Sequence, residues 1–191
     1  MIEGIKTGMF IERRYVRDGC KALWASLAGL VLAFGIVPAA FADGEAPSLA
    51  LDLREGDAPD VCNANVPQVR VTVNGVRAFG ILTVEVYGDD KKNFLSKEGR
   101  LRRTRVAAEN SPQTICVNVA GAGTYAVAAY HDLNADRKLG RKWNFLPKEP
   151  FALSNDPKLK LRKPRHHEAA FEAGALGADI TVNLRGSDPD A

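Results

Sequence analysis

Short segments in which apolar and polar residues alternate recur along the chain, and no long segment has the 3.6-residue period of an amphipathic helix. Alternation is typical of strands, because successive side chains of an extended backbone point to opposite faces. Strands are expected at 68–73, 81–87, 103–106, 114–119, 124–130, 168–172 and 179–184. Glycine-rich turns separate these segments. The pattern predicts an all-β fold, an antiparallel β-sandwich of about seven strands.

One turn carries a strong hairpin signal. The segments 114–119 and 124–130 flank Ala120-Gly121-Ala122-Gly123, which favours direct antiparallel pairing of the two strands. The segments 68–73 and 81–87 are joined around Asn74-Gly75 and Gly80.

The N-terminal segment carries an export signal. No charged side chain lies between Lys21 and Asp43, basic residues precede this apolar stretch, and Ala40-Phe41-Ala42 gives the small-x-small pattern of signal peptidase sites. We predict a signal peptide over 1–42 and a periplasmic or secreted protein. An uncleaved membrane anchor is the alternative, because the stretch is long enough to cross a bilayer.

The rest of the chain divides into three parts. Residues 43–65 have little pattern and are expected to be a leader or linker, 66–187 to be the sandwich domain, and 188–191 to be a tail. The whole chain has 26 Lys+Arg against 23 Asp+Glu, and residues 1–42 contain five of the basic and three of the acidic residues. The exported part is therefore close to neutral, which argues against a nucleic-acid partner.

The cysteines support this compartment. Cys20 lies before the apolar stretch, so export leaves Cys62 and Cys116. Two thiols in an oxidising compartment are expected to pair, and the alternative is two separately buried thiols.

Several motifs resemble one bacterial family. They are Leu82-Thr83-Val84-Glu85-Val86-Tyr87, the Gly123-Thr124-Tyr125-Ala126-Val127 strand that leads into His131-Asp132-Leu133-Asn134, the pair Ser154-Asn155, and Glu168-Ala169-Ala170-Phe171. Over residues 66–185 the chain resembles the family called domain of unknown function 2141. The resemblance implies an exported immunoglobulin- or transthyretin-like sandwich without an established activity. The chain departs from the family at Arg137, where a glycine is usual, and near Gly140, where an acidic residue is usual.

The segment after His131 offers candidate metal ligands. Asp132, Asn134 and Asp136 place oxygen-bearing side chains at alternate positions, as at the start of a calcium-binding loop. Arg137 and Trp143 stand where such a loop has glycine and a bidentate glutamate. The other interpretation is a turn in which these side chains accept hydrogen bonds from their own backbone.

Basic residues form two groups. Lys158, Lys160, Arg162 and Arg165 are candidates for contact with anionic glycans or lipid headgroups, and the same alternation with leucine is typical of an edge strand protected by cations. The second group is Lys97, Arg100, Arg102, Arg103 and Arg105.

Nothing in the sequence nominates a catalytic residue. His131, His166 and His167 are accompanied by neither a Gly-x-Ser-x-Gly nor a His-x-x-x-His pattern. The tail Leu184-Arg185-Gly186-Ser187 resembles the end of transthyretin-related hydroxyisourate hydrolases, with leucine in place of tyrosine.

We expect a non-catalytic binding or structural module of the bacterial cell envelope, without a cofactor, whose partner is an envelope glycan or protein. The alternatives are a calcium-assisted carbohydrate-binding module and an enzyme like the hydroxyisourate hydrolases.

Overall fold

The computed structural model describes residues 50–142, 147–158, 160 and 162–186, all of which belong to one compact unit, Glu45–Ala191. In chain order the elements are the 3-10 helix η1 (Glu55–Asp57), β1 (Gln68–Asn74), β2 (Ile81–Tyr87), β3 (Arg100–Ala107), β4 (Gln113–Asn118), β5 (Gly123–Asp132), β6 (Phe151–Leu153), the single-turn helix α1 (His166–Ala169), β7 (Ala170–Ala173) and β8 (Gly177–Asn183). The prediction of an all-β sandwich is confirmed.

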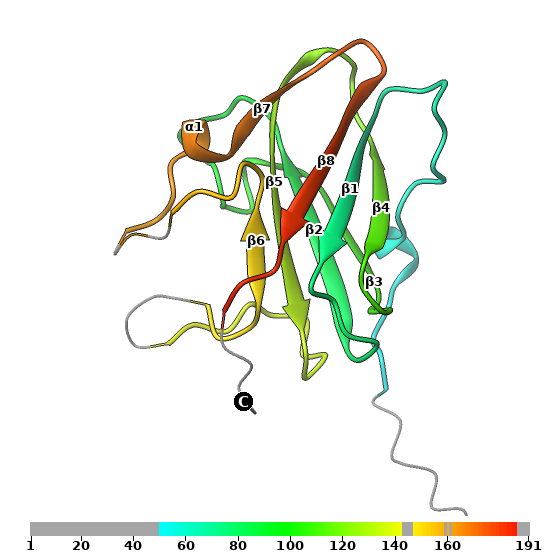
Figure 1. Cartoon of the computed structure of the whole chain (residues 1–191), viewed down its shortest axis with the longest axis vertical. Coiled ribbons are helices and arrows are strands. Elements are labelled where there is room, and N and C mark those ends of the chain that lie inside the picture. The colour runs from blue at the N-terminus through cyan, green and yellow to red at the C-terminus, as the bar shows by residue number, and fades with distance from the viewer. Residues whose placement is uncertain (1–49, 143–146, 159, 161, 187–191) are drawn as a thin grey trace, which may run out of the picture. The chain divides into compact units, whose positions relative to one another are not determined.

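The strands form two packed sheets (Figure 1). One is three-stranded, in the order β4-β1-β8, and the other is five-stranded, in the order β3-β2-β5-β6. Strand β7 also pairs with β5, at the end opposite β6. Five of the six pairings are antiparallel, and β1 and β8 run parallel.

The core lies between the sheets and follows the alternation of the strands. Val69, Val71 and Val73 of β1 are fully buried and face the other sheet. The side chains of the five-stranded sheet that pack against them are Leu82, Val84, Val86, Val127 and Ala129. Burial of each valine or leucine contributes about 1.5 to 3 kcal/mol, so this apolar layer holds the sheets together.

The hairpin expected around 120–123 is wrong. Strand β4 belongs to the three-stranded sheet and β5 to the five-stranded sheet, so this turn crosses from one sheet to the other. The connection from β1 to β2 crosses in the same way. Alternation shows which face of a strand is buried. It does not show whether two strands joined by a turn pair within one sheet or lie in two sheets that pack face to face.

Two further differences concern the C-terminal half. Strand β6 has only three residues and was not expected. The expected strand 168–172 begins as helix α1, because the Glu168 carboxylate accepts the Arg165 backbone N–H at 2.8 Å, and becomes β7 at Ala170.

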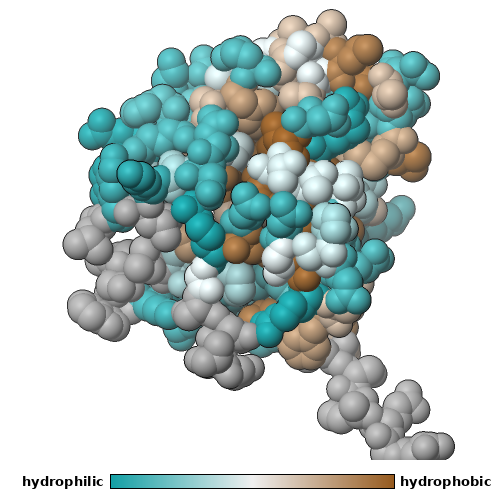
Figure 2. Space-filling view, in the orientation of Figure 1, coloured by the Kyte–Doolittle hydropathy of each residue, from teal (hydrophilic) through white to brown (hydrophobic). Residues whose placement is uncertain are grey.

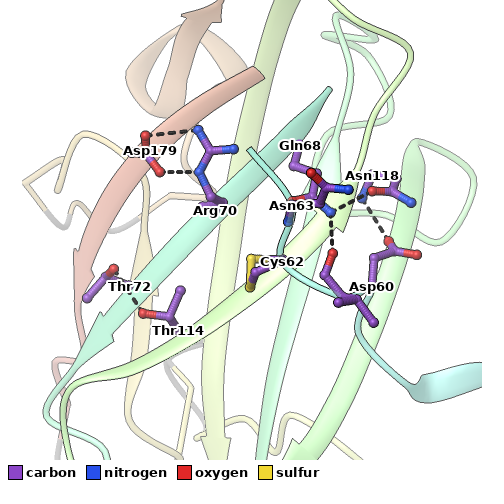
Figure 3. Close-up of a disulfide and its surroundings, with 11 residues drawn as sticks. Asp60, Cys62, Asn63, Gln68, Arg70, Thr72, Thr114, Asn118 and Asp179 are labelled. Carbon is purple, nitrogen blue, oxygen red and sulfur yellow. Dashed lines mark hydrogen bonds and ion pairs between the residues drawn. A yellow bond between two sulfur atoms is a disulfide. The ribbon is translucent and has the colours of Figure 1, made fainter. Parts of the chain in front are cut away.

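Part of the expected leader packs on the sandwich. The Cys62 and Cys116 sulfurs are bonded, with Cα atoms 5.3 Å apart, and Asp60 pairs with Cys116 in an isolated bridge (Figure 3). The Gln68 side-chain amide donates to Val61 O at 2.8 Å. Residues 60–63 are therefore fixed to one end of the three-stranded sheet.

Helix η1 is held by a buried ion-pair cluster. The Asp57 carboxylate accepts from Arg105 at 2.9 Å and lies 2.8 Å from the Arg137 guanidinium. Burial opposes the charge of Asp57, but the two arginines outweigh it and lower the pKa of this carboxyl.

The predicted signal peptide, 1–42, and tail, 188–191, lie outside the described residues. Within the described ranges, no helix is long and apolar enough to span a membrane.

Candidate binding site

The outer face of the three-stranded sheet is polar, and its side chains hydrogen-bond to one another across neighbouring strands. Arg70 on β1 donates two hydrogen bonds to Asp179 on β8, one of them 3.0 Å long, and the Thr72 and Thr114 hydroxyls are 3.3 Å apart (Figure 3). The Asn74 amide donates to the Asn183 carbonyl at 3.0 Å. In the space-filling view this side of the molecule is mainly hydrophilic or intermediate (Figure 2).

The outer face of the five-stranded sheet is built differently. All seven residues of β2 are buried, so its outward positions are covered as well as its inward ones. The register places Glu85 beside Ala128, and Ala128 beside Leu153. A second apolar cluster of Tyr87, Phe94, Ala126, Ala128, Leu153 and Ala169 forms on this face. The segment that contains Phe94 and helix α1 both contribute to this cover.

A charged cluster lies within this apolar surface. The Glu85 carboxylate accepts from Tyr87 at 2.5 Å, from Arg100 at 2.8 Å and from Arg103 at 2.6 Å, and Glu85 is 8% exposed. Burial first, and then the neighbouring Glu85 charge, raise the pKa of the Tyr87 hydroxyl far above its usual range. One carboxylate faces two guanidiniums, so the cluster is net positive.

A cavity of about 350 Å³ opens on this face. Its volume falls in the range of small-molecule sites, and the apolar surface of strands β2, β5 and β6 forms its floor. Its lining combines residues of these strands with residues of the segments that cover them, among them Leu95, Leu139 and Pro164, so the cavity is a recess between the sheet and its cover. The described residues that line it are Glu85, Tyr87, Leu95, Ala128, Ala129, Tyr130, Leu139, Arg141, Pro147, Phe151, Ala152, Leu153, Lys160, Arg162, Lys163 and Pro164.

A second, basic cavity of about 320 Å³ is lined by Lys91, Lys92, Phe94, Lys163, Pro164, Arg165, His166 and His167. Lys163 and Pro164 line both cavities and so form the wall between them. No described residue that lines the basic cavity carries a carboxylate.

The predicted anion-contacting residues divide between these cavities. Lys160 and Arg162 line the apolar cavity, Arg165 lines the basic one, and Lys158 lines neither. Lys160 and Arg162 also bind the Glu168 carboxylate, at 3.2 and 2.7 Å, and the Arg162 hydrogen bonds are the main reason that the pKa of Glu168 is well below its usual range. In place of an edge strand, Lys160 and Arg162 pair with each other in an isolated bridge.

The candidate metal ligands point to their own loop. Asp132 accepts the backbone N–H groups of Asp136 and Arg137, at 3.3 and 2.6 Å. Asn134 accepts from Asp136 at 3.2 Å, and Asp136 accepts from Lys138 at 2.8 Å. Burial raises the pKa of Asp132. This is the geometry of an Asx-type turn. Among the described residues, no group of three or more His, Cys, Asp or Glu side chains is placed to hold a metal ion.

The structure explains why Arg137 can stand where the family usually has glycine. Arg137 has a φ of +65°, in the left-handed region that favours the glycine usual in the family. In this chain the Arg137 guanidinium instead reaches Asp57 and helps to hold helix η1.

Other motif residues are used to fasten loops. His131 is buried and its Nε2 lies 2.6 Å from the Phe79 carbonyl oxygen. The Ser154 hydroxyl accepts the Val127 N–H at 2.9 Å and hydrogen-bonds to Ala169 O, and the Asn155 amide donates to Ala170 O at 2.5 Å. These side chains join β5 to the segments packed against it.

The residues of the hydrolase-like comparison are also engaged in structure. Arg185 donates to Pro157 O at 2.9 Å and contacts Asp156 at 2.8 Å, and Ser187 lies outside the described residues. His166 Nε2 lies 2.8 Å from Gly88 O, and its ring stacks edge-on against Phe94.

The sequence analysis did not identify the floor of the apolar cavity or two of the four Lys and Arg residues that line the basic cavity. Glu85, Tyr87 and Tyr130 were treated as strand residues, and Lys91 and Lys92 were not singled out. The sequence feature that could have revealed the cavity floor is the segment 81–87. It has apolar residues on both faces of the expected strand, and it also contains Glu85. A strand buried on both faces implies a second covered surface.

The comparisons with known proteins agree with this fold. Residues 71–181 match the model of a family described as "Uncharacterized protein conserved in bacteria (DUF2141)". The matched range begins within β1, ends within β8 and includes strands of both sheets. No curated protein and no solved structure matches the chain.

Proposed function

This chain belongs to the bacterial DUF2141 family, and we propose that it is an exported, non-catalytic binding module whose ligand occupies the apolar cavity on the outer face of the five-stranded sheet. The ligand is a small molecule with an apolar body. The sandwich acts as a rigid scaffold, and the covering segments shape the recess.

One observation carries the proposal: a recess of about 350 Å³ with a mostly apolar floor and a few polar groups that converge on it. Cavities of this kind are the usual small-molecule sites of proteins. Glu85 and Tyr87 supply fixed polar groups at the floor, because the Glu85 carboxylate is held by hydrogen bonds from Tyr87, Arg100 and Arg103.

The non-catalytic assignment rests on the placement of the motif residues. His131 and Ser154 are buried and bonded to backbone groups, and Asp132 is bonded to its own loop. None of these three is among the described residues that line either cavity. Catalysis needs reactive groups that converge on an accessible reacting atom.

Export is the second part of the proposal. The apolar stretch before Asp43 and the Ala40-Phe41-Ala42 pattern support it, and a disulfide is typical of exported proteins. Sequencing of the N-terminus of protein from a bacterial envelope fraction should give Asp43 as the first residue. A chain that retains residues 1–42 in the membrane would show an anchor instead.

A neutral fluorescent dye tests the cavity. Nile red should bind to the protein produced from the full chain in a bacterial host, with a rise and a blue shift in emission. Ala128→Phe places a ring in the recess and should weaken binding about tenfold or more, whereas the matched control Ala107→Phe, at an exposed position of β3, should not. Circular dichroism checks folding. The proposal fails if the dye does not bind, or if it binds equally to both variants.

A further inference from the structure

Resting on the proposed function, we infer that the ligand is a single-chain anionic amphiphile, with its chain in the apolar cavity and its anionic head in the adjoining basic cavity. The juxtaposition of the two cavities points to this ligand.

The shared wall sets the shape of the ligand. Lys163 and Pro164 line both cavities, so a molecule that crosses this wall has one part over Leu153 and Tyr130 and the other beside Arg165. The first part contacts mainly carbon, and the second contacts mainly cationic nitrogen. A ligand with one apolar and one charged end matches both environments.

The sign of the charge follows from the lining residues. Lys91, Lys92, Lys163 and Arg165 line the basic cavity and are exposed. In the part of the chain that the structure describes, Lys163 and Arg165 take part in no ion pair, so their charges are available. Lys91 also contacts the Asp89 carboxylate at 3.8 Å, but the cluster remains net positive and attracts an anion.

The apolar cavity does not favour a cationic ligand. Glu85 is the sole carboxylate among the described residues that line it, and Arg100 and Arg103 already neutralise it. The other charged residues that line it are all basic, namely Arg141, Lys160, Arg162 and Lys163, and two of them, Lys160 and Arg162, share Glu168.

The ligand is taken up as a single molecule and not as part of a bilayer. A surface that inserts into lipid presents exposed apolar side chains around its charged residues. The exposed large apolar residues of the described chain are Leu53, Val61, Phe79, Leu101 and Leu176, and none of them lines either cavity. The apolar surface at this site is instead recessed, with Tyr87 only 2% exposed.

Decanoate and 1-decanol separate the two parts of this inference. They share the same chain and differ in the charge of the head. Calorimetric titration of the protein should give a dissociation constant about tenfold or more lower for decanoate, because it alone engages the basic cavity. Acetate, which has the same carboxylate head without the chain, should bind much more weakly than decanoate.

Charge reversal identifies the residues. Arg165→Glu should weaken decanoate binding about tenfold and leave decanol binding unchanged, because Arg165 lines the basic cavity alone. Lys163→Glu, at a residue that lines both cavities, should weaken decanoate binding more than decanol binding. Lys158→Glu is the matched control, because Lys158 is exposed in the same segment and lines neither cavity. It should bind decanoate as the unmodified protein does.

The outcomes are distinguishable. Equal affinity for decanoate and decanol would overturn the anionic head and leave the cavity of the proposed function in place, whereas no binding of either would overturn both proposals. Acetate affinity equal to that of decanoate would also overturn the inference. Sedimentation of the protein with phosphatidylglycerol vesicles, without extraction of decanoate from them, would show a membrane-binding surface and contradict uptake of single molecules.

Discussion

The outer faces of the two sheets differ in how far they are covered: in β1 buried residues alternate with partly buried ones, whereas all seven residues of β2 are buried. On the three-stranded sheet, the outward residues pair across neighbouring strands, as Arg70 does with Asp179 and Asn74 with Asn183. On the five-stranded sheet, the charges converge on Glu85, and the surrounding residues leave an apolar recess. A face whose polar groups satisfy one another is complete, whereas a covered face with a recess is suited to a ligand.

The largest expected effect concerns the disulfide at the edge of the polar face. Replacement of both Cys62 and Cys116 by alanine should lower the free energy of unfolding by about 4 kcal/mol, because the bond closes a loop with a sequence separation of 54. Urea denaturation measures this change. The binding of Nile red under native conditions should persist, since the cavity lies on the other sheet. Loss of dye binding with the fold intact would break the separation between the two faces.

The two ion-pair systems should differ in strength. Glu85→Gln leaves two guanidiniums without their buried carboxylate, and we expect it to cost about 2 to 3 kcal/mol of stability. Asp179→Asn is the matched change on the polar face, where the aspartate side chain is 73% exposed, and it should cost about 0.5 kcal/mol. Thermal or urea unfolding of the two variants tests the comparison. Equal losses of stability in the two variants would mean that burial does not make the Glu85 ion pairs stronger than the Arg70–Asp179 pair.

A third, smaller effect appears in acid. The pKa of Asp57 is lowered in the folded state, so its ion pairs stabilise the protein above the unfolded pKa of about 4, and this contribution is lost as the pH falls through the folded value. Asp57→Asn should therefore lower stability at pH 7 by about 1 to 2 kcal/mol and reduce the loss between pH 5 and pH 2. Asp132 should act in the opposite direction, since its pKa is raised and protonation favours the folded state. Unfolding curves that keep their acid dependence in Asp57→Asn would contradict this.

The smallest effect is expected for calcium. The oxygens of Asp132, Asn134 and Asp136 already accept hydrogen bonds from the loop, so we expect a dissociation constant no tighter than about 1 mM. At an equal calcium concentration the stabilisation is then about 0.4 kcal/mol or less. Thermal unfolding with calcium and with a chelator measures it. A larger rise that Asp136→Ala removes would make this loop a second ligand site.

The sequence predicts the strands and the family well, and the connections poorly. Alternation identified the buried face of β1, since burial of alternate side chains is what produces the pattern. It could not decide which strands share a sheet, so the turn at 120–123 was misassigned. The Cys62–Cys116 bond was predictable because only two cysteines follow the predicted signal peptide.

The candidate site was predictable only in its basic residues. Arg162 and Arg165 stood out as part of a charge cluster, and both line a cavity. The floor depends on pairing in space, because Glu85 meets Ala128 and Arg103 through strand register. A sequence does not give register between distant strands, so a cavity assembled from β2, β5 and β6 has no local signature.

The assignment of the ligand to one face is tested most directly by amide chemical-shift changes during titration with decanoate. The account predicts the largest changes at Ala128, Leu153 and Lys163, with Thr72 and Thr181 of the three-stranded sheet unchanged. Changes centred on Thr72 and Thr181, or no changes at saturating decanoate, would contradict it.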